Sequence, residues 1–292
     1  MHLPDVQVAT VLAVVDHGTF EAAARALHVT PSAVSQRVRA LESAAGQVLV
    51  RRGTPCVPTP AGEAVVRLGR AQAALREEAL AALEPGAGHR LDLRVAVNAD
   101  SLATWVRDVL AEAATWDDVA LGLEVEDQAF SHDLLRRGDA LAAVTSDPRP
   151  VQGCSAERLG TLRYHPAAAP ALLDRCRSEE GPDWSRLPMV VFNAKDRLQH
   201  DLLAARGRPE PPAVHRVPTS QDFLAAVVAG LGWGMVPEPQ LDPLERAGDL
   251  VRIDPGHHVD TVLHWQRWRL DSDVLGRVTA AVRSAAARHL RP

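Results

Sequence analysis

The chain has 292 residues, more than one ordinary hydrophobic core accommodates, so at least two folded units are expected. A hydrophobic content of 46% and a charged content of 24% are typical of a globular protein in water, and no apolar run is long enough to cross a bilayer. The N-terminal segment does not resemble a signal peptide, and three widely spaced cysteines favour a reducing cytoplasm and argue against a metal cluster.

The net charge of −5 is unevenly distributed along the chain. Residues 1–90 carry nine arginines and eight acidic residues, for +1, whereas residues 91–292 carry 23 basic and 29 acidic residues, for −6. Residues 30–62 hold four arginines and one acidic residue, Glu42. A local basic patch in an otherwise acidic protein is typical of a small nucleic-acid-binding unit.

Three short helices are predicted near the N-terminus. Residues 4–16 have apolar side chains at helical spacing, and Gly18 ends this first helix. Thr19 can cap the second helix, "FEAAARAL", and Thr30 can cap a third helix with Pro31 at its first position. A tight turn joins the second helix to the third, which predicts a helix-turn-helix.

The third helix has an apolar stripe and a polar free face. The polar residues recur at i, i+3, i+4 and i+7: Ser32, Ser35, Gln36 and Arg39. A second helix of this kind enters the major groove and reads bases, while Arg37, Arg51 and Arg52 would hold phosphates. An ordinary solvated helix in an all-α subdomain remains the alternative explanation.

The string "FEAAARALHVTPSAVSQRVRALE", followed by "GQVLVRR" and "PTPAGE", resembles the N-terminal domain of LysR-type transcriptional regulators. The resemblance implies a winged helix-turn-helix over residues 1–58, with the wing at about 47–58. It also implies base-reading positions at Pro31, Ser32, Ser35 and Gln36. The chain departs from the family at "LVRR", where "LFxR" is common, and its wing tip "GTPCVPT" lacks the arginine that many members insert into the minor groove.

A long helix is predicted from Thr59, a cap residue, to Leu83. Apolar or small residues follow heptad spacing along it: Val65, Gln72 and Ala79, alternating with Leu68, Leu75 and Ala82. The pattern allows a coiled-coil seam or a helix packed on its own domain. In the family this segment, 59–88 with the hinge "EPGAGHR", is the linker helix that pairs two subunits.

From residue 89 the chain alternates strands and helices, which predicts parallel strands joined by right-handed crossovers. A first block has strands at 91–97, 119–126 and 140–145 and helices at 101–114 and 131–138. A second block has strands at 188–193, 213–218 and 232–238, a helix at 221–230 and a final helix from Ser272. Residues 162–170 are expected to cross between the blocks. The unit resembles the periplasmic-binding-protein-like effector domain of the same family, with subdomain I at about 91–162 and 267–292 and subdomain II at about 163–266.

Ligands of open α/β sheets bind beyond the carboxyl ends of the strands. The candidate effector-binding residues at those ends are Asn98, Asp100, Ser101, Glu126, Asp127, Thr145, Thr219, Ser220 and Asp222. Local roles are the alternatives: Asp100 as a helix cap, Thr219 with Asp222 as a capping box, and Thr145 bonded to nearby backbone. Several carboxylates suit a cationic ligand, and helix N-termini with Ser101 and Ser220 suit an anionic group, which together point to a basic amino acid.

Three further strings, "AVNADSLATW", "LEVED" and "LHW", resemble the ArgP/LysG branch of LysR-type regulators. The resemblance implies a cytoplasmic activator that senses lysine or arginine, binds promoter DNA as a homodimer or homotetramer, contacts RNA polymerase and controls a basic amino acid exporter gene. No cofactor is implied. The alternatives are a replication-initiation or nucleoid-type DNA binder with little effector response, and a regulator with a different effector.

An enzyme on the α/β cleft is a further alternative. The chain has no G-x-S-x-G nucleophile elbow, and "GLGWGMVP" lacks the Lys-Ser/Thr of a phosphate loop. His257 and His258 follow a Pro-Gly turn without a neighbouring cysteine, so a surface position is favoured over a metal site. No catalytic residue and no metal ligand is therefore expected, and the protein is predicted not to be an enzyme.

Overall fold

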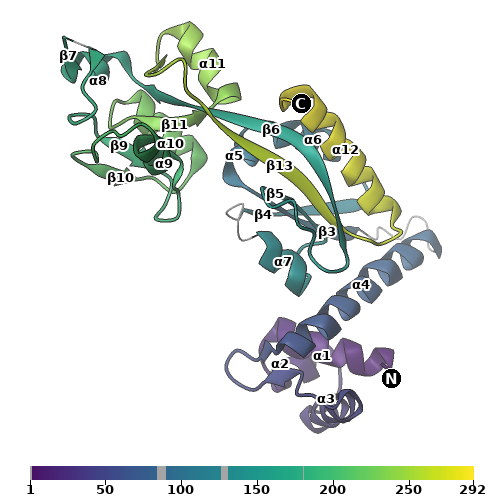
Figure 1. Ribbon diagram of the computed structural model, residues 1–292. Helices are drawn as coiled ribbons and strands as arrows, with labels where there is room; N and C mark the ends of the chain where they lie inside the picture. Colours follow the sequence, from purple (N-terminus) through teal and green to yellow (C-terminus); the bar gives the residue numbers. More distant parts are fainter. Residues whose placement is uncertain (1, 84–89, 126–130, 180) are drawn as a thin grey trace.

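A computed structural model of the chain describes residues 2–83, 90–125, 131–179 and 181–292. Figure 1 shows three parts: a small helical unit at the N-terminus, one long helix, and a two-lobed α/β unit. No helix in these described ranges is long and apolar enough to cross a membrane.

The N-terminal unit is a winged helix-turn-helix. Its elements are α1 (Asp5–His17), α2 (Phe20–Ala26), α3 (Pro31–Ala45), β1 (Val50–Arg51) and β2 (Val57–Pro58). The predicted caps are confirmed: Thr19 Oγ1 accepts a hydrogen bond from Ala22 N at 3.1 Å, and Thr30 Oγ1 accepts one from Ala33 N at 3.2 Å. Gly18 ends α1 with a φ of 74°, a left-handed conformation that glycine adopts without strain.

The long helix α4 (Pro60–Leu83) belongs to two environments. Val65 and Val66 are buried in the core of the helix-turn-helix unit, whereas Leu75, Leu80 and Leu83 further along are exposed. Val65 therefore packs as in the alternative of a helix that lies on its own domain, whereas Leu75 of the predicted seam is exposed, as are Leu80 and Leu83 outside that seam. Pairing of two such helices stays a prediction.

One mixed sheet forms the body of the C-terminal unit, with strand order β11-β6-β13-β5-β3-β4. Its strands are β3 (Leu91–Val97), β4 (Val119–Val125), β5 (Ala142–Thr145), β6 (Cys154–Ala168), β11 (Gly234–Pro237), β12 (Val251–Arg252), which also pairs with β6, and β13 (Val259–Trp268). Strands β4, β3 and β5 are parallel as predicted, but β13 and β6 are antiparallel. The expectation of a wholly parallel sheet is therefore wrong.

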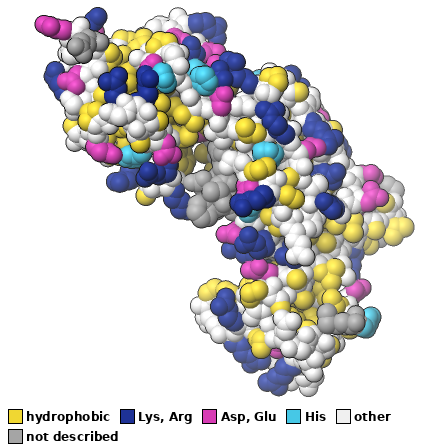
Figure 2. All heavy atoms as spheres, viewed as in Figure 1, with side chains coloured by type: hydrophobic (Ala, Val, Ile, Leu, Met, Phe, Trp, Pro, Cys, Tyr) yellow, Lys and Arg dark blue, Asp and Glu magenta, His cyan; other side chains and the backbone are white. Residues whose placement is uncertain are grey.

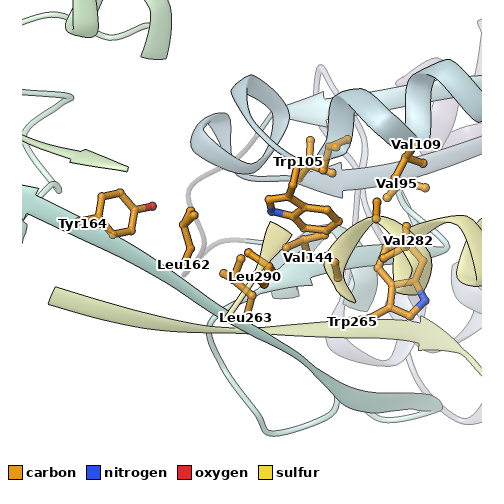
Figure 3. Close-up of a cluster of buried hydrophobic side chains, with 14 of the residues drawn as sticks. Val95, Trp105, Val109, Val144, Leu162, Tyr164, Leu263, Trp265, Val282 and Leu290 are labelled. Carbon is orange, nitrogen blue, oxygen red and sulfur yellow. The ribbon is translucent and has the colours of Figure 1, made fainter. Parts of the chain in front are cut away.

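Helices cover both faces of the first lobe because alternate residues of a strand point to opposite faces. Val95 and Val144 point toward α6 (Val106–Ala113) and α12 (Asp273–His289), and Trp105 and Trp265 fill this core (Figure 3). Ala96 and Ala143 point the other way and belong to the cluster that includes Leu135 of α7 (Ser131–Arg137). The predicted helix 101–114 is two helices, α5 (Ala99–Ala103) and α6, because Thr104 leaves the helical conformation.

The second lobe is smaller and has its own parallel strand pair. Its elements are α8 (Pro170–Arg175), β7 (Arg177–Ser178), β8 (Gly181–Pro182), β9 (Met189–Val191), α9 (Leu198–Ala205), β10 (Val214–Arg216), α10 (Ser220–Val228) and α11 (Glu238–Ala247). Strands β6 and β13 run from one lobe into the other (Figure 1). The segment 162–170, predicted as a crossover, is mostly the end of β6, so the lobes share two paired strands.

Candidate ligand cleft and DNA-binding surface

The surface of α3 presents the residues predicted to contact DNA. Pro31, Ser32, Gln36 and Arg39 are exposed, and Ser35 and Arg37 are partly exposed. Arg51 and Arg52 are exposed at the start of the wing, and the Arg52 guanidinium lies 4.8 Å from the centre of the Phe20 ring. Figure 2 shows basic side chains at the lower end of the molecule, where α3 lies in Figure 1. A polar helix face flanked by arginines has the chemistry needed to bind duplex DNA.

A cleft of about 390 Å³ lies between the two lobes. The first lobe lines it with Asn98 and Asp100, which follow β3, with Val125 at the end of β4, and with Ser146 after β5. The second lobe contributes the segment 192–198, which follows β9. The carboxyl ends of parallel strands from both lobes therefore meet at one cavity, as expected for a ligand site of an open α/β sheet.

Asp100 joins the two lobes at the base of this cleft. Its Oδ1 accepts a hydrogen bond from Ser220 Oγ of the second lobe at 2.9 Å, and its Oδ2 accepts one from the Tyr164 hydroxyl of β6 at 2.9 Å. Burial raises the pKa of the Asp100 carboxyl, the two hydrogen bonds oppose this shift, and the nearby Asp196 carboxylate raises the pKa further. The capping hypothesis for Asp100 is wrong, since the residue before the helix is Asn98 and the Asp100 side chain points across the lobes.

Two buried polar side chains lie beside Asp100. Asn98 and Ser101 are 3% and 0% exposed, and Asn98 Oδ1 and Ser101 Oγ have no hydrogen-bond partner among the described residues. Buried polar atoms are usually paired, so an unpaired acceptor at a cavity wall is suited to a ligand. Asn98 lines the cleft and meets this condition, whereas Ser101 lies behind the lining.

A turn after β9 contributes charged groups that sequence reasoning missed. Asn193 Oδ1 accepts hydrogen bonds from Lys195 N at 2.7 Å and Asp196 N at 3.1 Å, which closes the turn. Asp196 Oδ2 accepts a hydrogen bond from Phe192 N at 2.9 Å, which orients its carboxylate. Lys195, Asp196 and Arg197 all line the cleft. One signal was available: Lys195 is the only lysine of the chain and follows a predicted strand.

Several predicted effector residues do not line the cleft. Thr219 and Asp222 form the alternative capping box, in which Thr219 Oγ1 accepts from Asp222 N at 3.2 Å and donates to Asp222 Oδ2 at 2.6 Å, and both are exposed. Thr145 is buried and accepts from Asp147 N at 3.2 Å, while its neighbour Ser146 lines the cleft instead. Glu126 and Asp127 lie outside the described residues. Of the predicted residues that the structure describes, Asn98 and Asp100 line the cavity, and Ser220 donates a hydrogen bond to Asp100.

The histidine pair of the Pro-Gly turn makes local contacts. His257 Nδ1 lies 3.0 Å from Asp254 Oδ1, and His258 Nε2 lies 3.7 Å from Asp260 Oδ2. Within the ranges that the structure describes, no group of histidine, cysteine and acidic side chains is arranged to hold a metal ion.

Comparison with known families supports both halves of the chain. Residues 6–63 match the family model "Bacterial regulatory helix-turn-helix protein, lysR family". Residues 86–287 match the model "LysR substrate binding domain". Together the two models cover the helix-turn-helix unit and the two-lobed unit.

The full chain also matches individual regulators. It is 47% identical over 287 residues to the lysine export transcriptional regulatory protein LysG of Corynebacterium efficiens, covering 97% of each chain. It matches full-length LysG of Corynebacterium glutamicum with bound effector arginine at a TM-score of 0.89 and 42% identity, covering 99% of this chain and 100% of that one. A second full-length structure of that LysG gives a TM-score of 0.64 at 42% identity, covering 100% of both chains. The chain belongs to the LysR family of bacterial transcriptional regulators.

Proposed function

We propose that this LysR-type regulator binds promoter DNA through α3 and senses a basic amino acid, arginine or lysine, in the cleft between its lobes. The Asp100 carboxylate carries the proposal, because it lies at the cleft and its hydrogen-bond partners among the described residues are two hydroxyl groups and not a cation. A buried carboxylate without a paired cation is costly, and a ligand cation would lower this cost. The relatives named for lysine export, and the LysG structure with arginine, support this choice.

The charges of the cleft suit both ends of such a ligand. Asp100 and Asp196 place two carboxylates at the cleft that suit an ammonium or guanidinium group. Lys195 and Arg197, whose guanidinium lies 3.6 Å from the Asp201 carboxylate, place positive charge there that suits a ligand carboxylate. The sequence-based hypothesis was that helix N-termini with Ser101 and Ser220 bind the anionic group of the ligand. The Ser220 hydroxyl donates to Asp100, and Ser101 does not line the cavity, so the turn 193–197 is the better candidate.

Binding across the cleft would regulate DNA affinity through the position of the lobes. A ligand shifts a conformational equilibrium only when it binds one arrangement more tightly, and contacts to both lobes supply that difference. The DNA-bound form would be a homodimer or homotetramer in the cytoplasm, paired through the exposed leucines of α4, that contacts RNA polymerase. Its target would be an amino acid exporter gene.

Calorimetry on the full chain tests the effector directly. We expect binding heat with arginine and with lysine, and none with alanine or with glutamate, because a ligand without a side-chain cation cannot satisfy both carboxylates. No heat with either basic amino acid would exclude the proposed effector and favour a DNA binder with little effector response. Heat with alanine alone would point to a different effector class.

A further inference from the structure

The linker helix α4 is held on two sides. On one side Gly69 allows α4 to approach α1 closely, since a Cβ there would lie 3.2 Å from Val8 Cγ1. On the other side Arg67 Nη1 donates to the carbonyl oxygen of Arg136 at 3.0 Å. Glu78 Oε1 accepts from Val274 N at 3.0 Å, at the start of α12. The same helix therefore contacts both the DNA-binding unit and the first lobe of the effector unit.

Arg70 connects these two sides through one guanidinium group. Its Nη2 donates to Asp16 Oδ1, at the end of α1, at 2.5 Å. Its Nη1 donates to the carbonyl oxygen of Arg137 at 2.7 Å and forms an ion pair with Asp139. The Arg70 side chain is 19% exposed. The three acceptors are bonded from two nitrogens of one planar guanidinium group, whereas a lysine side chain would have to bond all three from a single nitrogen.

The turn that receives Arg70 is built around a glycine. Gly138 has a φ of 73°, and a Cβ at this position would lie 2.8 Å from the Trp268 ring and 3.3 Å from Arg70 Cδ. Asp139 is held from the other side by Arg137 Nε at 2.9 Å. The turn is therefore shaped to bring the Asp139 carboxylate and a backbone carbonyl to Arg70.

The Arg70 contact and the ligand cleft lie at opposite ends of the same two strands. Strand β5 starts just after Asp139 and ends at Thr145, next to the cleft residue Ser146. Strand β3 runs beside it in parallel and ends before Asn98. At about 3.3 Å per residue, the seven residues of β3 span roughly 20 Å. Because these hydrogen-bonded strands connect the two places, a displacement of the lobe at the cleft would also displace Asp139.

We propose that Asp16, Arg70 and Asp139 form a coupling site that fixes the DNA-binding unit to the first lobe within one subunit. Arg70 is a positioning residue in this site, and its role in effector response rests on the proposed function. Two full-length structures of C. glutamicum LysG match this chain at TM-scores of 0.89 and 0.64 with the same identity, so the two structures differ from each other in conformation.

One test needs no ligand. Cys56, Cys154 and Cys176 are buried, so dyes attach selectively to cysteines introduced at the exposed positions Glu21 and Arg107. Each labelled chain is mixed with excess unlabelled chain, so that most oligomers carry one dye pair. We expect a narrow distribution of energy-transfer efficiency for the parent chain and a broader or shifted one for both Arg70→Gln and Arg70→Lys.

The matched control is Arg76→Gln, on the same helix, where the side chain is exposed and the guanidinium makes no ion pair or hydrogen bond with the described residues. It should keep the parent distribution. Identical distributions for the parent and both Arg70 variants would overturn the coupling site.

The second test measures how strongly arginine binding in the cleft changes the affinity for DNA. DNA affinity is measured by fluorescence anisotropy with and without saturating arginine, and couplings of this kind typically amount to about 5–150-fold. We expect Arg70→Gln and Asp139→Asn to reduce the ratio to within about twofold of one, while the Kd for arginine in the free protein changes by less than about threefold. A parent-like ratio in both variants would overturn the proposal. If the parent chain fails to bind arginine, the proposed effector fails, and the energy-transfer test still decides the coupling site.

Discussion

The DNA-binding unit and the ligand cleft present their functional groups in opposite ways. The residues of α3 predicted to contact DNA come from one short helix and are mostly exposed. The cleft draws its polar groups from segments more than ninety positions apart, such as Asp100 and Asp196, and partly buries them. A helix face is a local property of the sequence, whereas a cleft exists only after distant strands have paired. Substitutions in the two regions should therefore have separate effects, on DNA binding in one and on ligand binding in the other.

The largest expected effect is at Asp100. Asp100→Asn keeps the size of the side chain but removes the charge, and hydrogen bonds to charged groups contribute about 1.5–3 kcal/mol, so we expect the Kd for arginine to rise about 10- to 100-fold. Calorimetry measures this change, and DNA affinity without ligand should stay the same. As the control, Asp222→Asn should leave the Kd unchanged because Asp222 is exposed and outside the cleft. Equal losses in both variants would contradict the placement of the ligand.

Measuring arginine affinity over a series of pH values tests the same role of Asp100. Burial raises the pKa of Asp100 above 3.8, and only the ionised carboxylate attracts a cation. Arginine affinity should therefore fall as the pH decreases through this raised pKa, by up to about tenfold per pH unit for a single proton. The folding stability of the free protein should change in the opposite direction. Because the carboxyl pKa is higher in the folded than in the unfolded chain, the free energy of unfolding falls as the pH rises from the unfolded to the folded pKa. Asp100→Asn should flatten both dependences; a profile identical to the parent would exclude Asp100 as the titrating group.

The DNA surface should respond to substitution without any change in the cleft. We expect Gln36→Ala to reduce discrimination between a site selected from a random library and a scrambled duplex by about tenfold, since a base contact contributes about 1–3 kcal/mol. Arg51→Ala should instead weaken binding to both duplexes equally and reduce the salt dependence. Gel shifts at several salt concentrations measure both effects. Full discrimination by Gln36→Ala would exclude this role for α3.

The smallest expected effect is at the capping box of α10. Thr219→Ala removes the acceptor for Asp222 N, and loss of such a cap costs about 1 kcal/mol of stability. Thermal unfolding should show the loss, with an unchanged Kd for arginine. A changed Kd with unchanged stability would return Thr219 to the ligand site.

The sequence predicted the elements whose signals are local. The caps at Thr19 and Thr30 were predicted correctly because a cap, a glycine stop and a helical stripe lie within a few residues. Strand β6 was missed over most of its length, because its burial follows no simple alternation and Gly160 interrupts it. Asp196 was missed because only the fold brings its carboxylate, from the second lobe, close enough to Asp100 to affect the pKa of that residue. The local sequence around Thr219 and Asp222 fits a capping box and a ligand site equally well, and only the fold distinguishes the two roles.

The paired strands β6 and β13 also bear on how such a regulator can evolve. Their backbones hydrogen-bond from Val259 with Tyr164 to Trp268 with Cys154, so the mechanical link between the lobes depends little on the side chains that line the cavity. Most of the lining comes instead from short segments beyond the strand ends, such as 98–100 and 192–198, and β13 itself contributes Thr261. Substitutions there can change which molecule is recognised while the connecting ribbon is conserved in shape. A regulator of this design can acquire a new signal without acquiring a new mechanism of response.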